Sequence, residues 1–348
     1  MVRIFKPTLE TKLQFRINSA IYSLHLVDKG AGVRNYKNIL FVRIVGFVLS
    51  LMAGIPICGY SQQDPVFTQY MNNLLTIQPA YAGISGQLNV TGISRAQWIG
   101  FEGAPNTNSL TISSPITKYN IALGLSIVND KWGPLRQNGI NVDYAFRIQL
   151  REDQYLSFGL KGEVNTFQAN FTDLRIWDSP DMVFMYDVKL KFIPNMGLGI
   201  LWHSDRFFLG ASSPKILKDD VKSESGVNAY SEVIHIYGMA GYVFFLNDIV
   251  KFKPTILYRW AERTPSYVDF TTSFLLYDQV WIGATYRMKN SVGLIFQYHV
   301  NPQLKFGYSY DLTTFHPSQV NSGTHEFMIS YDFITLYKGR RHTSPKYF

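Results

Sequence analysis

The residues that could perform catalysis are few and widely separated in this chain of 348 residues. An acyl-transfer site needs a nucleophile, a base and an orienting carboxylate, and Ser330, His299 and Asp332 carry those groups. No local motif joins them, so such a site would have to assemble from distant segments of the fold. The alternative is that they are ordinary polar residues of strands. We therefore predict that the protein is not an enzyme.

Motifs for binding metals or phosphates are also missing from the sequence. Gly197 and Gly199 lack the third glycine of a dinucleotide-binding loop, and His325 and Glu326 lack the second histidine of a zinc-binding helix. The seven histidines stand singly instead of at ligand spacing. The sequence therefore predicts no cofactor and no bound metal.

The positive charge of the chain is concentrated near its N-terminus. The formal net charge is +8, which would suit a nucleic-acid partner. Residues 1–61 hold eight lysines and arginines but only two acidic residues, which leaves a net charge of +2 on the remainder. We therefore expect no nucleic-acid partner.

Residues 1–61 have the features of a leader with a signal peptide. Lys37 and Arg43 precede an apolar run at 44–58 that is short for a transmembrane helix. The next three residues end in Ser61 and have the small-x-small pattern of a cleavage site, so we predict cleavage after Ser61. A retained signal anchor is the alternative. The single cysteine lies in the apolar run, so cleavage would leave a mature chain without thiols.

From residue 87 onward, segments of about ten residues alternate between apolar and polar side chains and are separated by turn signals. In segment 140–150, one face carries Ile140, Val142, Tyr144, Phe146, Ile148 and Leu150. The other face carries Asn141, Asp143, Ala145, Arg147 and Gln149. One face suits lipid and the other suits water, as in the strands of a membrane barrel.

Fourteen such segments can be recognised, at 87–98, 107–115, 119–128, 138–150, 154–167, 195–203, 206–212, 233–246, 250–260, 267–277, 280–288, 291–300, 303–312 and 324–335. The even number suits the closure of a single-chain barrel, which removes exposed sheet edges from lipid. A soluble β-sandwich is the alternative, but outward apolar side chains on nearly every segment would leave little polar surface. We therefore predict an all-β fold, a transmembrane antiparallel β-barrel of about 14 strands over residues 87–335.

Two further expectations concern side chains of this barrel. Charged residues on the inward faces should pair with one another or line a wet lumen: Asp143, Arg147, Lys161, Glu163, Arg287, Lys305, Asp311, Glu326 and Asp332. Aromatic residues near segment ends would suit the girdles at the two membrane interfaces: Trp98, Trp132, Trp281 and Tyr286.

The longest interruptions between strands are residues 168–194 and 213–232. Long insertions usually carry function or extend into solvent. The polar stretch 213–232 is the better candidate for an exposed loop, whereas 168–194 is apolar enough to pack on another part of the protein. A basic tail, residues 336–348, follows the last strand.

Residues 62–86 lie between the predicted cleavage site and the first strand. Phe67, Tyr70, Met71 and Leu74 recur at three- and four-residue spacing, which indicates one short helical face. The segment could plug the lumen, cap the periplasmic mouth or dock another protein. Disorder is the remaining alternative, and the aromatic content argues against it.

The chain resembles the PorP/SprF outer-membrane proteins of the type IX secretion and gliding machinery. The resemblance runs in the family's order through nearly all of the mature chain. It is carried by QDPVFTQYM at 63–71, PAYAG at 79–83, RAQWIGFEGAP at 95–105, LGLSIVND at 123–130, LSFGLK at 156–161 and GTHE at 323–326. Gln78 departs from the asparagine usual before PAYAG, and the basic tail departs from a terminal aromatic residue.

The resemblance implies an integral protein of the Gram-negative outer membrane that contacts outer-membrane lipid and associates with periplasmic ring proteins of the secretion machine. It also implies support for export or surface attachment of a secreted cargo or surface adhesin. An outer-membrane diffusion channel or substrate transporter is the alternative, because small inward residues such as Gly124 and Gly159 would leave room in a wet lumen.

We hypothesise that residues 62–83 and 95–105 form a contact, either on the periplasmic side or within the lumen. Arg95, Gln97 and Trp98 are of the types that anchor interfaces, although they could equally fix the N-terminal segment inside the barrel. The candidate residues for partner binding or for a plug are Asp64, Pro65, Phe67, Gln69, Tyr70, Asn73, Pro79, Tyr81, Arg95, Gln97 and Trp98.

Overall fold

The structure is a computed structural model that describes residues 66–173, 186–222, 228–262, 264–314 and 322–333. The predicted leader, Asp64, Pro65 and the basic tail lie outside the described residues. No helix in the described part of the chain is long and apolar enough to span a membrane.

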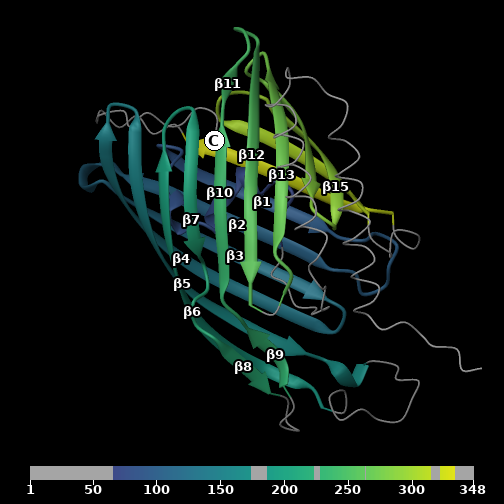
Figure 1. Cartoon of the computed structure of the whole chain (residues 1–348). Coiled ribbons are helices and arrows are strands. Elements are labelled where there is room, and N and C mark those ends of the chain that lie inside the picture. Colours follow the sequence, from purple (N-terminus) through teal and green to yellow (C-terminus); the bar gives the residue numbers. More distant parts are fainter. Residues whose placement is uncertain (1–65, 174–185, 223–227, 263, 315–321, 334–348) are drawn as a thin grey trace, which may run out of the picture. The chain divides into compact units, whose positions relative to one another are not determined.

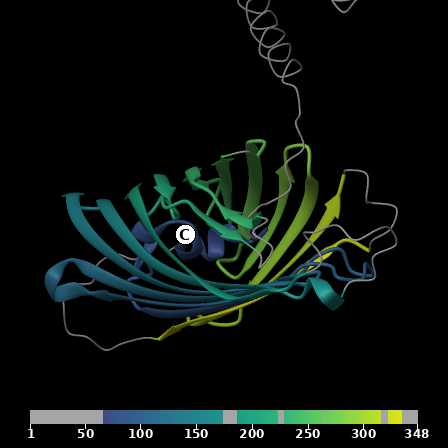
Figure 2. The same ribbon diagram turned by 90° about the horizontal axis from the view of Figure 1, so that it is seen from below.

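Among the described residues, fourteen antiparallel strands form a closed barrel, which confirms the predicted fold (Figures 1 and 2). Neighbours in the chain are neighbours in the sheet, β1 pairs with β17, and β10 pairs with β12 beside the short strand β11 (Phe244–Phe245). The fourteen strands are β1 (Leu88–Ala96), β2 (Asn106–Ile116), β3 (Ile121–Trp132), β4 (Leu135–Arg151), β5 (Gln154–Ala169), β6 (Val188–His203), β7 (Phe207–Ser213), β10 (His235–Tyr242), β12 (Val250–Ala261), β13 (Tyr267–Leu276), β14 (Val280–Arg287), β15 (Ser291–His299), β16 (Leu304–Thr313) and β17 (Thr324–Phe333).

The alternation in the sequence sets the two faces of the wall. In β4, Ile140 and Val142 point outward and are 55% and 54% exposed, whereas Asn141 and Asp143 point inward and are 5% and 0% exposed. Apolar side chains stay on the outside because lipid covers them there, and polar ones pair inside. The predicted division of segment 140–150 into two faces is therefore confirmed over its central residues.

The two rims of the barrel differ in the length of their connections. One rim, here called the terminal end, holds the start of β1, the end of β17 and the connections 117–120, 152–153, 204–206, 243–249, 277–279 and 300–303. The other rim, here called the loop end, holds the connections 97–105, 133–134, 170–187, 214–234, 262–266, 288–290 and 314–323. In bacterial barrels the short turns face the periplasm and the longer loops face the exterior.

The polar stretch 213–232 was predicted to be an exposed loop, and its described residues include two short strands. It contains a separate hairpin of β8 (Asp219–Lys222) and β9 (Asn228–Glu232) at the loop end (Figure 1). Val221 and Tyr230 of this hairpin are buried in one cluster with Phe167 and Ile193 of the long strands β5 and β6. The rings of Phe167 and Tyr230 stack with their centroids 4.7 Å apart.

The prediction of aromatic girdles is wrong for two of the four residues. Trp281 points inward and is 6% exposed, with the Lys253 ammonium 4.3 Å from its ring centroid. Trp132 packs against the cluster under the hairpin. Tyr286 points outward and is 48% exposed, and Trp98 lies in the connection 97–105.

Candidate functional site

The segment before β1 folds as three short 3-10 helices: η1 (Tyr70–Asn72), η2 (Leu74–Thr76) and η3 (Pro79–Tyr81). Asn73 has non-helical dihedral angles and separates η1 from η2, so the predicted single helical face is divided between turns. All four residues of that face, Phe67, Tyr70, Met71 and Leu74, are nevertheless buried.

The segment lies within the ring of strands, as Figure 2 shows. The Tyr70 hydroxyl lies 3.1 Å from Thr255 Oγ1 of β12, and Asn73 Nδ2 donates to Ser109 Oγ of β2 at 3.5 Å. Farther along, Lys161 Nζ of β5 donates to the Leu75 carbonyl at 3.2 Å. These strands are well separated around the ring, so the segment spans the lumen.

Apolar packing holds the same segment against the wall. Tyr70, Met71 and Leu74 share one cluster with inward residues of the strands, among them Leu201 of β6 and Leu257 of β12. Burying a side chain of this size contributes about 1.5–3 kcal/mol, so this packing is a large part of what fixes the segment.

Glycines in the wall leave the space that the segment occupies. A Cβ atom on Gly159 would overlap the backbone of Ala80, and one on Gly199 would overlap the side chain of Gln78. Gly124 faces Leu75 in the same way, with a Cβ atom placed there 3.0 Å from Leu75 Cδ2. The small residues that suggested a wet lumen therefore make room for the segment instead.

Gln78 fixes η3 to the wall. Its side-chain oxygen accepts from the Ala80 N–H at 3.3 Å, and its Nε2 donates to the carbonyls of Ile200 and Ala211 at 3.1 and 3.2 Å. Ile200 and Ala211 are register partners on β6 and β7. The side chain that departs from the family pattern is thus fully buried and hydrogen-bonded at both of its polar atoms.

Arg95 holds the start of the segment near the loop end. Its guanidinium pairs with Glu326 at 2.9 Å and with Asp311 at 3.1 Å, and it donates to Thr68 Oγ1 at 2.7 Å. Glu326 also accepts the backbone N–H groups of Thr68 and Gln69 at 2.9 and 2.8 Å. A buried charge is tolerated only where it is paired and hydrogen-bonded, and here the N-terminal segment supplies part of that pairing.

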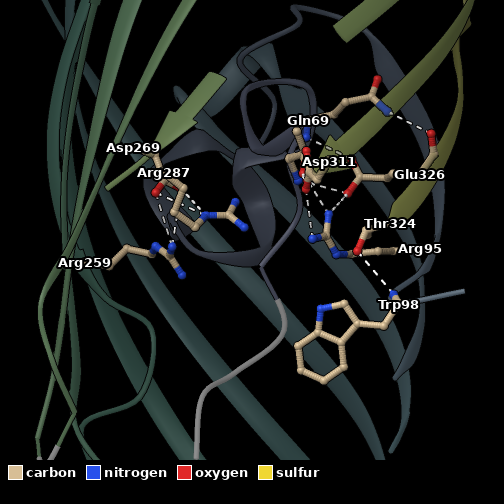
Figure 3. A network of polar contacts seen from close by, with 10 residues as sticks. Gln69, Arg95, Trp98, Arg259, Asp269, Arg287, Asp311, Thr324 and Glu326 are labelled. Carbon is tan, nitrogen blue, oxygen red and sulfur yellow. Dashed lines mark hydrogen bonds and ion pairs between the residues drawn. The ribbon is translucent and has the colours of Figure 1, made fainter. Parts of the chain in front are cut away.

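A second network, which the sequence did not predict as a unit, faces the first across the lumen (Figure 3). Asp269 of β13 accepts from Arg259 of β12 at 3.3 Å and from Arg287 of β14 at 3.2 Å. Other inward charges pair as expected, with Lys161 2.9 Å from Asp143 and Lys305 2.9 Å from Asp332. The sequence shows which charged side chains point inward. It does not show which of them form ion pairs, because those pairs depend on the register between strands.

The structure brings most of the candidate residues together. Phe67, Gln69, Tyr70, Asn73, Pro79, Tyr81 and Arg95 belong to the segment or touch it. Gln97 and Trp98 lie in the connection 97–105 at the loop end, where the Trp98 N–H donates to Thr324 Oγ1 at 3.3 Å.

The residues considered for catalysis have other partners. Ser330 lies 2.8 Å from Thr91 Oγ1, His299 lies 2.8 Å from Gln297 Nε2, and Asp332 pairs with Lys305. Within the described ranges, no group of three or more His, Cys, Asp or Glu side chains is placed to hold a metal ion. The described part of the lumen therefore contains an anchored peptide segment and several ion pairs.

Two solved structures are similar to this chain at low sequence identity. The Omp33 outer-membrane protein of Acinetobacter baumannii is 11% identical, with a TM-score of 0.43 over 72% of this chain and 100% of that one. The CymD monoaromatic hydrocarbon channel is 9% identical, with a TM-score of 0.45 over 79% of this chain and 95% of that one. Among curated proteins, none matches the sequence.

One protein family matches most of the chain. Its model, described as type IX secretion system membrane protein PorP/SprF, matches residues 59–331. That range includes the segment inside the lumen, every strand from β1 to β16 and most of β17. The chain therefore belongs to the PorP/SprF family of type IX secretion system membrane proteins.

Proposed function

We propose that this outer-membrane component of a type IX secretion system is a closed barrel that docks other proteins at its two rims. In this proposal the terminal end associates with periplasmic ring proteins, and the loop end supports export or surface attachment of a cargo protein or adhesin. The proposal assigns no chemical reaction to the barrel.

The filled lumen carries the proposal. The N-terminal segment is packed, hydrogen-bonded and ion-paired to strands around the ring, and wall glycines leave space for it. Passage of a polypeptide would require all of these contacts to break. A protein of a secretion machine that does not itself conduct the cargo has docking as its remaining role.

Side chains at the two rims support separate docking roles, with Lys118 and Tyr119 exposed at one rim and Gln97 and Trp98 partly exposed at the other. Tyr119, in the connection 117–120, is 59% exposed at the terminal end beside Lys118. Gln97 and Trp98 lie at the loop end with the hairpin of β8 and β9. Tryptophan, tyrosine and arginine are the common anchors of protein interfaces, so Tyr119 and Trp98 are the main candidates here.

Affinity purification from outer membranes tests the proposal, with a tag on the C-terminal tail and two double variants that serve as controls for each other. Lys118→Ala with Tyr119→Ala should reduce recovery of ring proteins and leave recovery of a surface protein unchanged. Gln97→Ala with Trp98→Ala should do the reverse. Heat-modifiable gel mobility verifies that each barrel is folded.

Loss of neither partner in either folded variant would contradict docking at these rims. Planar-bilayer conductance distinguishes docking from the alternative function, which is a diffusion channel. The proposal predicts negligible conductance for the intact barrel, whereas a large and stable conductance, together with no recovered partner, would establish a diffusion channel.

A further inference from the structure

Two cations lie directly opposite each other on the outer surface of the barrel at the loop end. Lys131 of β3 and Arg136 of β4 are register partners beside the two-residue connection 133–134. Both side chains are exposed, and they lie on the same outward face as Ile127 and Ile140.

Their place along the strands indicates the level of lipid headgroups. Ile127 and Ile140 are register partners, 45% and 55% exposed, and belong to the apolar surface that faces lipid. Two residues farther along each strand, Asn129 Nδ2 donates to Asn138 Oδ1. The cations follow two residues beyond this amide pair, about 13 Å from the isoleucines along the strand. The outward side chains therefore become more polar toward the loop end, from isoleucine to asparagine to a full charge.

Within the residues that the structure describes, no acidic side chain forms an ion pair with either member of this pair. Like charges directly opposite on neighbouring strands are destabilising. The next residues in register are neutral amides, Asn106 of β2 beside Lys131 and Gln168 of β5 beside Arg136. Glu102 lies on the nearby connection 97–105, but within the described parts of the chain neither cation forms an ion pair. An anion between the two would remove the repulsion.

We propose that Lys131 and Arg136, flanked by Asn106 and Gln168, bind the phosphate of an anionic membrane lipid in the outer leaflet. The guanidinium offers paired N–H donors to phosphate oxygens, and the ammonium adds a point charge. The amides add donors at both sides. Because the acyl chains of such a lipid would lie along the apolar surface that contains Ile127 and Ile140, a lipid fits this site better than a soluble phosphate.

Native mass spectrometry of the purified full-length barrel in detergent tests the proposal. A glucosamine-based lipid with two phosphates is titrated, and its dephosphorylated counterpart and inorganic phosphate are the other two probes. The variant is Lys131→Gln with Arg136→Gln. The matched control is Arg151→Gln with Lys289→Gln, which removes the same charges from exposed positions on other strands and connections.

We expect the apparent dissociation constant for the phosphorylated lipid to rise on the order of tenfold in the variant. It should stay unchanged in the control. The dephosphorylated lipid should bind the unaltered barrel as weakly as the phosphorylated lipid binds the variant. Equal losses in variant and control would overturn the proposal. So would equal affinity for the two lipids in the unaltered barrel, a comparison that does not depend on any variant folding. Inorganic phosphate that binds as tightly as the lipid would overturn the assignment to a lipid.

Discussion

Gly159 of β5 lies so close to the N-terminal segment that a Cβ atom on it would come within 2.7 Å of the Ala80 Cα atom. The contacting atoms belong to the backbone of η3, which cannot relieve the overlap by a change of rotamer as a side chain can. The barrel wall and the segment are therefore shaped to each other, and the wall glycine is part of what keeps the lumen filled.

Substitution of Gly159 by alanine should loosen the segment. The added methyl group would force η3 away from β5 and cost about 1–3 kcal/mol, as overpacking usually does. Gly162→Ala on the same strand is the matched control, because a Cβ atom there meets no atom within 4 Å. The midpoint of heat-modifiable gel mobility should fall for Gly159→Ala only. Equal midpoints for the two variants would show that the segment does not depend on this contact.

Glu326→Gln should weaken the attachment near the loop end. The change removes a buried charge from Arg95 and one of two oxygens that accept the N–H groups of Thr68 and Gln69. We expect a loss of about 3 kcal/mol, because breaking a buried ion pair leaves a charge under-compensated. Equilibrium unfolding in urea from lipid vesicles measures the loss. Glu102→Gln, at an exposed position, should change the unfolding free energy by less than about 0.5 kcal/mol.

A third prediction concerns Asp187, which lies before β6. Its carboxylate accepts from the Thr172 N–H at 2.9 Å and from Thr172 Oγ1 at 3.0 Å. The backbone N–H of Thr172, as the main cause, lowers the pKa of Asp187 below its ordinary value of 3.8. Because the folded pKa is the lower one, this stabilisation is complete above the ordinary value and is lost as pH falls through the folded value.

Hydrogen exchange at the Thr172 amide measures the effect of pH on this bond. After correction for the intrinsic pH dependence of exchange, protection should be constant from neutral pH down to the ordinary carboxyl value and fall below it. Asp187→Asn should show no such step. Protection that persists in acid in the unaltered chain would contradict the prediction.

The strands were predictable because each one carries its own evidence. The alternation that separates Ile140 from Asp143 is local, and it recurs in all fourteen segments. The same alternation places Trp281 inward, between the outward residues Val280 and Ile282 in sequence, so its burial could have been found from its position in the strand. The prediction that Trp281 belongs to an aromatic girdle relied on its residue type and did not use its position in the inward–outward alternation.

The polar networks were not predictable in the same way. Arg95 meets Asp311 and Glu326 only because β1 pairs with β17 and thereby closes the barrel. The register between distant strands is set by the whole ring, so it cannot be inferred from the residue at any single position. The three-residue spacing in the N-terminal segment correctly identified its buried face, but the interruption at Asn73 depends on its fit to the wall.

A covalent lock tests whether the segment must move for secretion. Leu75→Cys and Gly124→Cys place thiols at facing positions, because a Cβ atom on Gly124 would lie 3.0 Å from Leu75 Cδ2, and gel mobility without reductant verifies the disulfide before secretion is measured. The predicted mature chain has no cysteine that would compete. If docking at the rims is the function, the locked barrel should support secretion at the level of the reduced one. Leu75→Cys with Gly162→Cys cannot cross-link, since Gly162 faces outward, and controls for the substitutions. Secretion that stops on oxidation and returns on reduction, in the first pair alone, would show that the segment has to leave the lumen.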